Sequence, residues 1–304
     1  MNENKSNRKP ILDITDINEE FKKLHENLSL LHNRFMALAM DYTHYVDNSW
    51  GQKEIFTLRD SVTYRFFSTK LHTEILIRQH FAIEHRFKEQ LKKDPKIIFG
   101  TYMPSNPYFD RAEEEISSIF DSFMYHQVSV FDYIGTLVNY ICGPVSDKQK
   151  SLKWTNLARS CRDSKNHFGK KPLADKIKDI DNKFVNKLYG YRSTLIHEKA
   201  EKSRYSFSIQ LGKEENIKAN FIATERLLKQ FAELKKLSQE SFVTTKYVAF
   251  WIMNKSIEVV TEILFALKDD MEKNPKVPFG MFGYHDKENN RILPASTPWW
   301  KEKK

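Results

Sequence analysis

Cysteine, glycine and proline are all scarce in this chain of 304 residues, and each shortage argues against a class of protein. The two cysteines, Cys142 and Cys161, are too few for a disulfide framework or a Cys-based zinc site, and we interpret them as structural thiols. Nine glycines and ten prolines, set against 29% charged residues, favour helices over a β fold rich in turns.

Long apolar runs are absent as well, because no stretch approaches the roughly 18 residues that a membrane span needs. The N-terminal sequence MNENKSNRKP is polar and lacks the apolar region of a secretory signal. We therefore expect no membrane association and a cytoplasmic location.

The familiar motifs for phosphate loops and zinc sites are missing too: the sequence contains no GxGxxG, GxxxxGK[ST] or HExxH. The pairs His25 with His32 and His80 with His85 are conceivable metal ligands. Isolated histidines on amphipathic helices are, however, far more often surface or packed residues. We predict no metal and no cofactor.

What the chain does contain is apolar, aromatic and basic material. Hydrophobic residues make up 40% of it, with 22 Phe and 13 Tyr, which is ample for a core. The formal net charge of +9 permits a polyanionic partner such as RNA, whose binding would depend on salt. A solvated basic surface without any nucleic-acid role fits the same charge, so both interpretations stay open.

Apolar residues recur at steps of three and four along most of the chain, which predicts helices. The expected helices cover residues 16–45, 58–92, 110–142, 147–162, 176–201, 224–237 and 242–271. Ser61–Phe67, inside the second of these, also alternates in the manner of a strand. Residues 205–221 alternate around a turn and predict a β-hairpin. The expected fold is all-α, a helical bundle with long antiparallel helices and a small β-hairpin insertion.

Asp94–Tyr108, with three prolines and a glycine, is the best candidate for a domain boundary. We expect an N-terminal helical region at 1–108, which starts with a disordered stretch at 1–12, and a helical domain at 109–273. An irregular tail at 274–304 carries Trp299 and Trp300 and is expected to lie on the protein surface or on a partner.

The helix expected at 176–201 has two apolar stripes. The first faces a core and consists of Ile177, Ile180, Phe184, Leu188, Tyr191 and Leu195. The second lies about 120° further round the helix and consists of Val185, Tyr189, Arg192 and Ile196. Such a helix is either central in a bundle or buries its second face against a partner chain. Arg192 interrupts that second stripe, with Ser193 beside it and His197 just beyond.

The stretch Arg192-Ser-Thr-Leu-Ile-His197 resembles the R-x(4–6)-H motif of the HEPN superfamily, all-helical domains many of which are metal-independent ribonucleases. The resemblance covers roughly the region 110–271. It implies an endoribonuclease that acts on RNA, with Arg192, Ser193 and His197 as catalytic residues at a homodimer interface. Such domains often serve in toxin–antitoxin or phage-defence systems, which implies an antitoxin or regulatory protein as a further candidate partner.

The same spacing also occurs at Arg65–His72, Arg78–His85 and Arg162–His167, so the context of each match has to decide. Only Arg192–His197 stands near the end of a long two-striped helix that follows a strong pair of helices. One departure is Ser193, because active family members often have Asn, Asp or His directly after the arginine. A hydroxyl can still donate to a phosphate or orient the histidine.

By the chemistry that the resemblance implies, His197 would act as general base or acid on the 2′-hydroxyl or the leaving 5′-oxygen. Arg192 would hold the phosphate and stabilise the charge that develops on it. Two alternatives stay open. One is a non-catalytic HEPN-like module that binds RNA or nucleotide, and the other is a helical scaffold that makes contacts through the hairpin and the Trp-rich tail.

Overall fold

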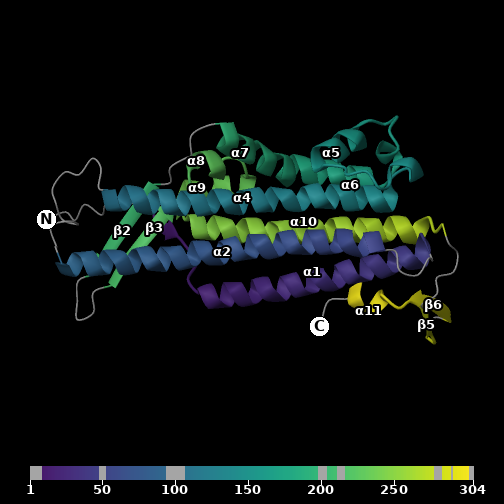
Figure 1. The fold of residues 1–304 in the computed structure, drawn as a ribbon, viewed down its shortest axis with the longest axis horizontal. Coiled ribbons are helices and arrows are strands. Elements are labelled where there is room, and N and C mark those ends of the chain that lie inside the picture. Colours follow the sequence, from purple (N-terminus) through teal and green to yellow (C-terminus); the bar gives the residue numbers. More distant parts are fainter. Residues whose placement is uncertain are drawn as a thin grey trace. The chain divides into compact units, whose positions relative to one another are not determined.

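Figure 1 shows the computed structural model, which describes residues 9–47, 53–93, 107–197, 204–210, 216–276, 283–288 and 290–300. Most of these residues are helical and the strands are short, so the predicted all-α fold with a small β-hairpin is confirmed. The longest helices are Ile17–Tyr45 (α1), Lys53–Lys93 (α2), Pro107–Cys142 (α4) and Thr245–Lys273 (α10). None of the described helices combines the length and the apolar character needed to cross a membrane.

The chain divides into two compact units, each assembled from separate stretches. Unit 1 comprises residues 1–17, 69–125 and 189–252, and unit 2 comprises residues 18–68, 126–188 and 253–304. The divisions fall inside α1, α2, α4, α10 and the helix Asn186–His197 (α7), each of which contributes residues to both units. Most of the boundary loop expected at 94–108 lies outside the described residues, which omit 94–106. Its last two residues, Pro107 and Tyr108, are the first residues of α4.

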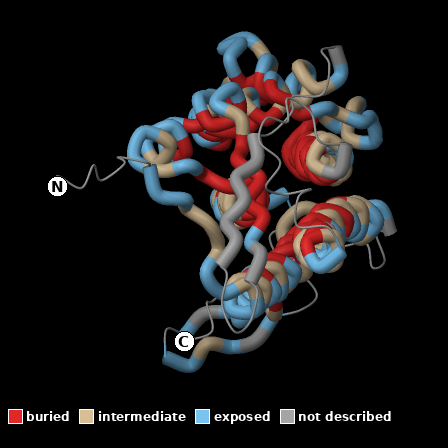
Figure 2. The backbone as a smooth tube through the Cα atoms, turned by 90° about the vertical axis from the view of Figure 1, so that its left-hand side faces the viewer, coloured by how far each residue is buried: buried red, intermediate tan, exposed pale blue. Residues whose placement is uncertain are grey.

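The long helices arise where apolar residues recur every three or four positions. α4 and α10 are buried around most of their circumference, whereas α1 and α2 keep many exposed residues between the buried ones (Figure 2). The strand alternative at Ser61–Phe67 is wrong, because these residues form part of α2. Val62 and Phe66, one helical turn apart, are both buried there. The helical spacing thus continues through this stretch and joins the apolar residues on either side of it.

Unit 1 contains the predicted hairpin, formed by Arg204–Gln210 (β2) and Asn216–Ile222 (β3), which pair antiparallel. Its turn lies outside the described residues. The hairpin is fixed to α2 by two contacts from β3 (Figure 1). The backbone N–H of Ala219 donates to Glu84 Oε1 at 2.9 Å, and the ring of Phe221 meets that of His80 edge to face at 5.0 Å.

The expectation of disorder over residues 1–12 is wrong for its last part. Ile11–Leu12 (β1) pairs parallel with Phe242–Val243 (β4), which directly precedes α10. Asp13 secures this junction, since it accepts a hydrogen bond from Thr244 Oγ1 at 2.6 Å and forms an ion pair with Lys246 at 2.8 Å. So short a strand leaves no periodic pattern, and its partner lies in a distant part of the sequence.

The helix expected over 224–237 is divided into Glu225–Leu228 (α8) and Ala232–Glu240 (α9). Thr224 caps the first by accepting the backbone N–H of Leu227. Phe231 lies between the two helices and is buried against Trp251, with ring centroids 5.1 Å apart. Because Phe231 is buried at this point, the chain does not continue as a single α-helix from 225 to 240.

In unit 2, Trp154–Arg162 (α5) begins later than the predicted residue 147. Val145–Asp147 (η1) forms a single 3-10 turn instead, because the side chain of Asn139 donates to the carbonyls of Asp147 and Lys150. The chain then passes close to α4 at Gly135, where a Cβ atom would lie 2.5 Å from the Leu152 carbonyl oxygen. Only glycine accommodates this approach.

The central helix predicted over 176–201 is Leu173–Ile180 (α6), a π-helical turn at Asp181–Val185, and Asn186–His197 (α7). Residues 198–201 lie outside the described part. The prediction of one regular α-helix is therefore wrong at the π turn, where an extra residue is inserted into the helical ladder. The core-facing stripe is confirmed on both sides of the turn as far as Tyr191, because Ile177, Ile180, Phe184, Leu188 and Tyr191 are all buried. Its last member, Leu195, is only half-buried.

The π turn contains the buried carboxylate of Asp181. Its Oδ1 accepts from the indole N–H of Trp154 at 2.7 Å, and its Oδ2 accepts from Arg162 at 2.6 Å. Trp154 in turn packs edge to face on Phe131 of α4 at 5.5 Å. Asp181 thereby joins both ends of α5 to the central helix.

The tail expected to be irregular from residue 274 contains a hairpin, Gly283–Asp286 (β5) with Arg291–Pro294 (β6), and a helical turn, Thr297–Trp300 (α11). The left-handed Asn290, with φ of 47°, lies in the hairpin turn. Both Ser296 Oγ and Trp300 Nε1 donate to the buried carboxylate of Asp41 in α1, the latter at 2.8 Å. The expectation of an irregular tail is therefore wrong for these residues, and the side chain of Trp300 is buried whereas that of Trp299 is exposed.

Replacing Asp181 with alanine should lower the free energy of unfolding by about 2–4 kcal/mol, because Trp154 and Arg162 would lose their shared acceptor. Urea unfolding at neutral pH measures the change. Asp179→Ala is the matched control. Asp179 is half exposed and its ion pair with Lys183 lies at the surface, so its loss should cost less than about 0.5 kcal/mol. Equal effects at the two positions would contradict the structural role of Asp181.

Stability should depend on pH through Asp41. Burial raises the pKa of Asp41 from 3.8 to about 6, although the hydrogen bonds from Ser296 and Trp300 act in the opposite direction. Because the folded protein binds this proton more tightly than the unfolded chain does, the free energy of unfolding falls as pH rises between these values.

Asp41→Asn should remove this dependence, so that the stability of the variant relative to the wild type rises by up to about 3 kcal/mol between about pH 4 and pH 7. Urea unfolding of both proteins across this range gives the difference, in which the other titrating groups cancel. Two parallel stability curves would show that Asp41 titrates normally.

Candidate functional site

All three predicted site residues lie on α7, the helix that follows the π turn. Arg192 is half-buried and Ser193 is exposed. His197 is the last residue of α7, and its side chain lies outside the part that the structure describes. The backbone thus places the three residues on the last two turns of a single helix.

The guanidinium of Arg192 lies over the ring of Tyr125 in α4, with its central carbon 5.6 Å from the ring centroid. Its Nε atom is buried and has no hydrogen-bond partner among the described residues. Within the same part of the chain, no carboxylate forms an ion pair with it. Tyr125 therefore holds the flat face of the group while its positive charge stays available for an anion.

A second arginine lies beside this helix. Arg226 of α8 donates to Thr194 Oγ1 at 3.0 Å, and Thr194 itself donates to the carbonyl of Gly190 at 3.3 Å. The hydrogen bond holds an exposed guanidinium against the turn that contains Ser193. Two cations therefore border the exposed part of α7.

The second apolar stripe opens to solvent toward the end of α7. Val185 is fully buried, Tyr189 is half-buried, and Ile196 has 50% of its surface exposed. Arg192 and His197 are about 140° apart around an ideal helix, so a single α7 does not direct both side chains at one atom. A site that uses both residues needs a second surface.

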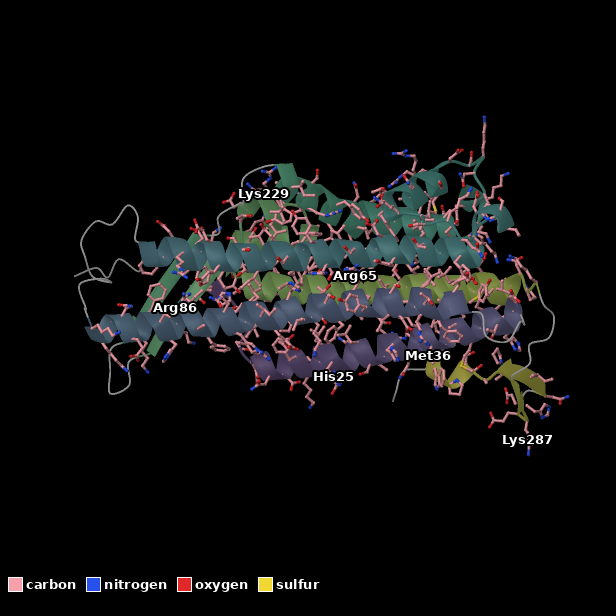
Figure 3. All side chains as sticks on the ribbon, in the orientation of Figure 1. His25, Met36, Arg65, Arg86, Lys229 and Lys287 are labelled. Atoms are coloured by element: carbon pink, nitrogen blue, oxygen red, sulfur yellow. The ribbon has the colours of Figure 1, made fainter. Side chains whose placement is uncertain are left out.

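The four matches to the R-x(4–6)-H motif also differ in the contacts that their arginines make. Arg162 is bound to Asp181, and His167 Nε2 lies 2.7 Å from the carbonyl oxygen of Cys142. Arg65, labelled in Figure 3, donates to the hydroxyl of Tyr133 at 3.3 Å. Arg78 is 81% exposed on its side chain and lies 4.0 Å from Glu74. Of the four arginines, Arg192 alone has neither a hydrogen bond nor an ion pair to a described residue.

The two thiols are buried, and burial raises the pKa of both above the ordinary thiol value, to about 11 for Cys161. The Sγ atom of Cys142 also lies 3.4 Å from Oδ2 of Asp270. Because the thiolate is the reactive form, neither cysteine is prepared to act as a nucleophile near neutral pH. This fits their interpretation as structural thiols.

Of the histidines considered as metal ligands, His80 is only 2% exposed and packs against Phe221. Burial, followed by the charge of Lys246, holds the pKa of His80 well below its ordinary value. His80 is thus a neutral core residue near pH 7. Across the described residues, no three His, Cys, Asp or Glu side chains are grouped as a metal site would need.

Sequence reasoning missed Tyr125 and Arg226, the two residues that support the exposed part of α7. Each is distant in the sequence from the residue that it contacts, and neither belongs to a motif. No signal in the sequence could have paired them with α7.

No family model, curated protein or solved structure matches the chain. The choice of this site therefore depends on the motif in α7 and on the surroundings of Arg192.

Proposed function

We propose that the protein is a HEPN-type, metal-independent endoribonuclease whose site is built from Arg192, Ser193 and His197. The observation that supports this most directly is the guanidinium of Arg192. It lies over Tyr125 without an acidic partner among the described residues, on a helix that ends at His197. A cation held in this way is suited to a phosphodiester, which it can grip through two parallel N–H groups.

In the proposed reaction, the 2′-hydroxyl of the substrate attacks the adjacent phosphorus and the bond from phosphorus to the 5′-oxygen breaks. One histidine removes the proton from the 2′-hydroxyl, and a protonated histidine gives a proton to the leaving 5′-oxygen. Arg192 stabilises the negative charge on the phosphate oxygens in the transition state. The products carry a 2′,3′-cyclic phosphate and a 5′-hydroxyl.

Two protomers are proposed to share the site. Ile196 and Tyr189 offer an apolar surface that a second copy would cover, and a two-fold axis there would bring Arg192 and His197 of both chains to one cleft. Each protomer would then supply one histidine, so that the base and the acid come from different chains. An antitoxin or regulatory protein that covers α7 would block the cleft, as expected for a toxin–antitoxin or phage-defence role.

The second candidate function is RNA binding without cleavage. Ser193 favours it, since active members of the family often have Asn, Asp or His at this position. The side chain of Ser193 is exposed, and a neutral hydroxyl neither carries charge nor titrates near pH 7. Binding assays alone do not separate the two candidates, whereas cleavage assays do.

Wild-type protein should cleave a pool of structured and single-stranded RNA in the presence of EDTA and leave 2′,3′-cyclic ends. Arg192→Ala and His197→Ala should each reduce the rate by a factor of about 100 or more, because each removes a group that acts in the transition state. Gel separation and end-group analysis of the fragments measure both effects.

Arg78→Ala and His85→Ala are matched controls, because they remove the same residue types at the same kind of spacing in α2. Both should cleave at wild-type rates. Circular dichroism and light scattering verify that all variants keep the fold and the oligomeric state of the wild type. Inactive wild-type protein that still binds the RNA would favour the second candidate. Loss of activity in the α2 controls would contradict the assignment of the site to α7.

A further inference from the structure

Almost all of the net charge of the chain lies in one segment of unit 2. The segment 148–187 contains twelve Lys and Arg but only four Asp, a surplus of eight out of the nine in the whole sequence. The rest of the chain is therefore close to neutral. The segment includes α5, Phe168–Lys170 (η2), α6 and the π turn.

The segment forms a one-sided layer, because its apolar residues are turned into the core. In α5, the buried residues are Trp154, Leu157, Ala158 and Cys161, and the exposed ones are Thr155, Asn156, Arg159 and Arg162. Nitrogen-tipped side chains project outward from the part of the chain that carries α5 and α6 (Figure 3). The charge is thus presented to solvent on one side.

Several of the cations are neutralised by acidic neighbours. The pairs are Lys150–Asp147, Arg162–Asp181, Lys171–Asp270, Lys176–Glu262, Lys178–Asp175 and Lys183–Asp179. By contrast, Lys153, Arg159, Lys165 and Lys170 are exposed and have no ion pair with any described residue. We call these four residues the α5 basic surface. Lys153 is the N-cap of α5, Arg159 lies within this helix, Lys165 lies in the turn that follows it, and Lys170 is the last residue of η2.

The backbone under this surface is firmly held. Arg162 ties the end of α5 to Asp181. The next loop is closed by Asp163 and Asn166, whose side chains accept the backbone N–H groups of Lys165 and Phe168 at 2.9 and 3.0 Å. The α5 helix is about 14 Å long, which spans roughly four phosphates of one strand. The charges therefore stand over a distance that a nucleic-acid backbone can follow.

We propose that the α5 basic surface binds the sugar–phosphate backbone of RNA. The choice of RNA rests on the proposed function, whereas the match of surface charge to a polyphosphate backbone does not. An anionic membrane fits the surface less well. A membrane-binding helix presents bulky apolar side chains beside its cations, and no large hydrophobic residue between 148 and 187, all of which the structure describes, is exposed.

The test measures binding of a fluorescent RNA of about 20 nucleotides whose 2′-hydroxyls are methylated, so that it cannot be cut, at salt concentrations between about 0.05 and 0.2 M. The triple variant Lys153→Gln, Lys165→Gln, Lys170→Gln should bind about tenfold more weakly at the lower salt. It should also reduce the slope of log affinity against log salt by about two, because fewer counterions are released.

The matched control is Lys235→Gln, Lys236→Gln, Lys287→Gln, which removes three exposed lysines from α9 and from the turn after β5 (Lys287 is labelled in Figure 3). It should change the affinity less than about twofold, as expected for cations outside the α5 basic surface. DNA of the same sequence should bind through the same lysines, because these side chains contact the phosphates that both nucleic acids carry.

Three results would overturn the proposal: no binding by the wild type, equal losses in both triple variants, or lysine-dependent binding to phosphatidylserine vesicles that exceeds binding to RNA. The failure of the ribonuclease proposal is distinguishable, because the uncleavable RNA does not require Arg192 or His197 to react. If the protein does not cleave RNA but its binding depends on the three lysines, the α5 basic surface would be supported and only the ribonuclease proposal would be overturned.

Discussion

The buried carboxylate of Asp181 is the interaction on which the organisation of unit 2 depends. It lies in a π turn between α6 and α7, and it accepts hydrogen bonds from the first and the last residue of α5, Trp154 and Arg162. A buried carboxylate is stable only while both of its donors remain in place, because loss of either donor would leave part of its charge without a hydrogen bond. α5 is thereby locked onto the central helix, and the cations on its outer side stand on a fixed support. Arg162, one of the four arginines in R-x(4–6)-H matches, is thus already bound to a carboxylate.

Much of the fold could be predicted from the sequence, because the long helices repeat a single pattern over many turns. α1, α2, α4 and the β2–β3 hairpin form at or near the expected residues. The failures share a different cause. β1 depends on β4, the late start of α5 depends on Asn139, and the π turn depends on two donors from the preceding helix α5. Each of these features is decided by contacts between separate elements, which periodicity does not encode. The prediction for the tail failed for the same reason, since Asp41 fixes Ser296 and Trp300 from the other end of the chain.

The candidate site was predictable only as a motif on one helix. The spacing of the residues predicted Arg192, Ser193 and His197 near the end of a two-striped helix, and all three lie on the last turns of α7. What makes Arg192 chemically interesting is its contact with Tyr125 and its lack of an acidic partner among the described residues, and neither property could be read from residue spacing. The second stripe was expected to be covered by a core or by a partner, and in the single chain it is buried at Val185 and open at Ile196. Exposure of the stripe therefore increases from the π turn to the end of α7.

We propose that one RNA-cleaving site is assembled from the α7 helices of two protomers, each of which supplies its His197. Mixing wild-type protein with an equal amount of the inactive His197→Ala protein, under conditions of subunit exchange, tests it most directly. Mixed dimers would then contain only one His197 and should not cleave, so only the wild-type dimers would remain active. With random subunit exchange, we expect the mixture to keep about a quarter of the cleavage rate of the same total amount of wild type. A mixture that exchanges subunits and still keeps half of that rate would show that each protomer cleaves by itself, which would contradict a shared site.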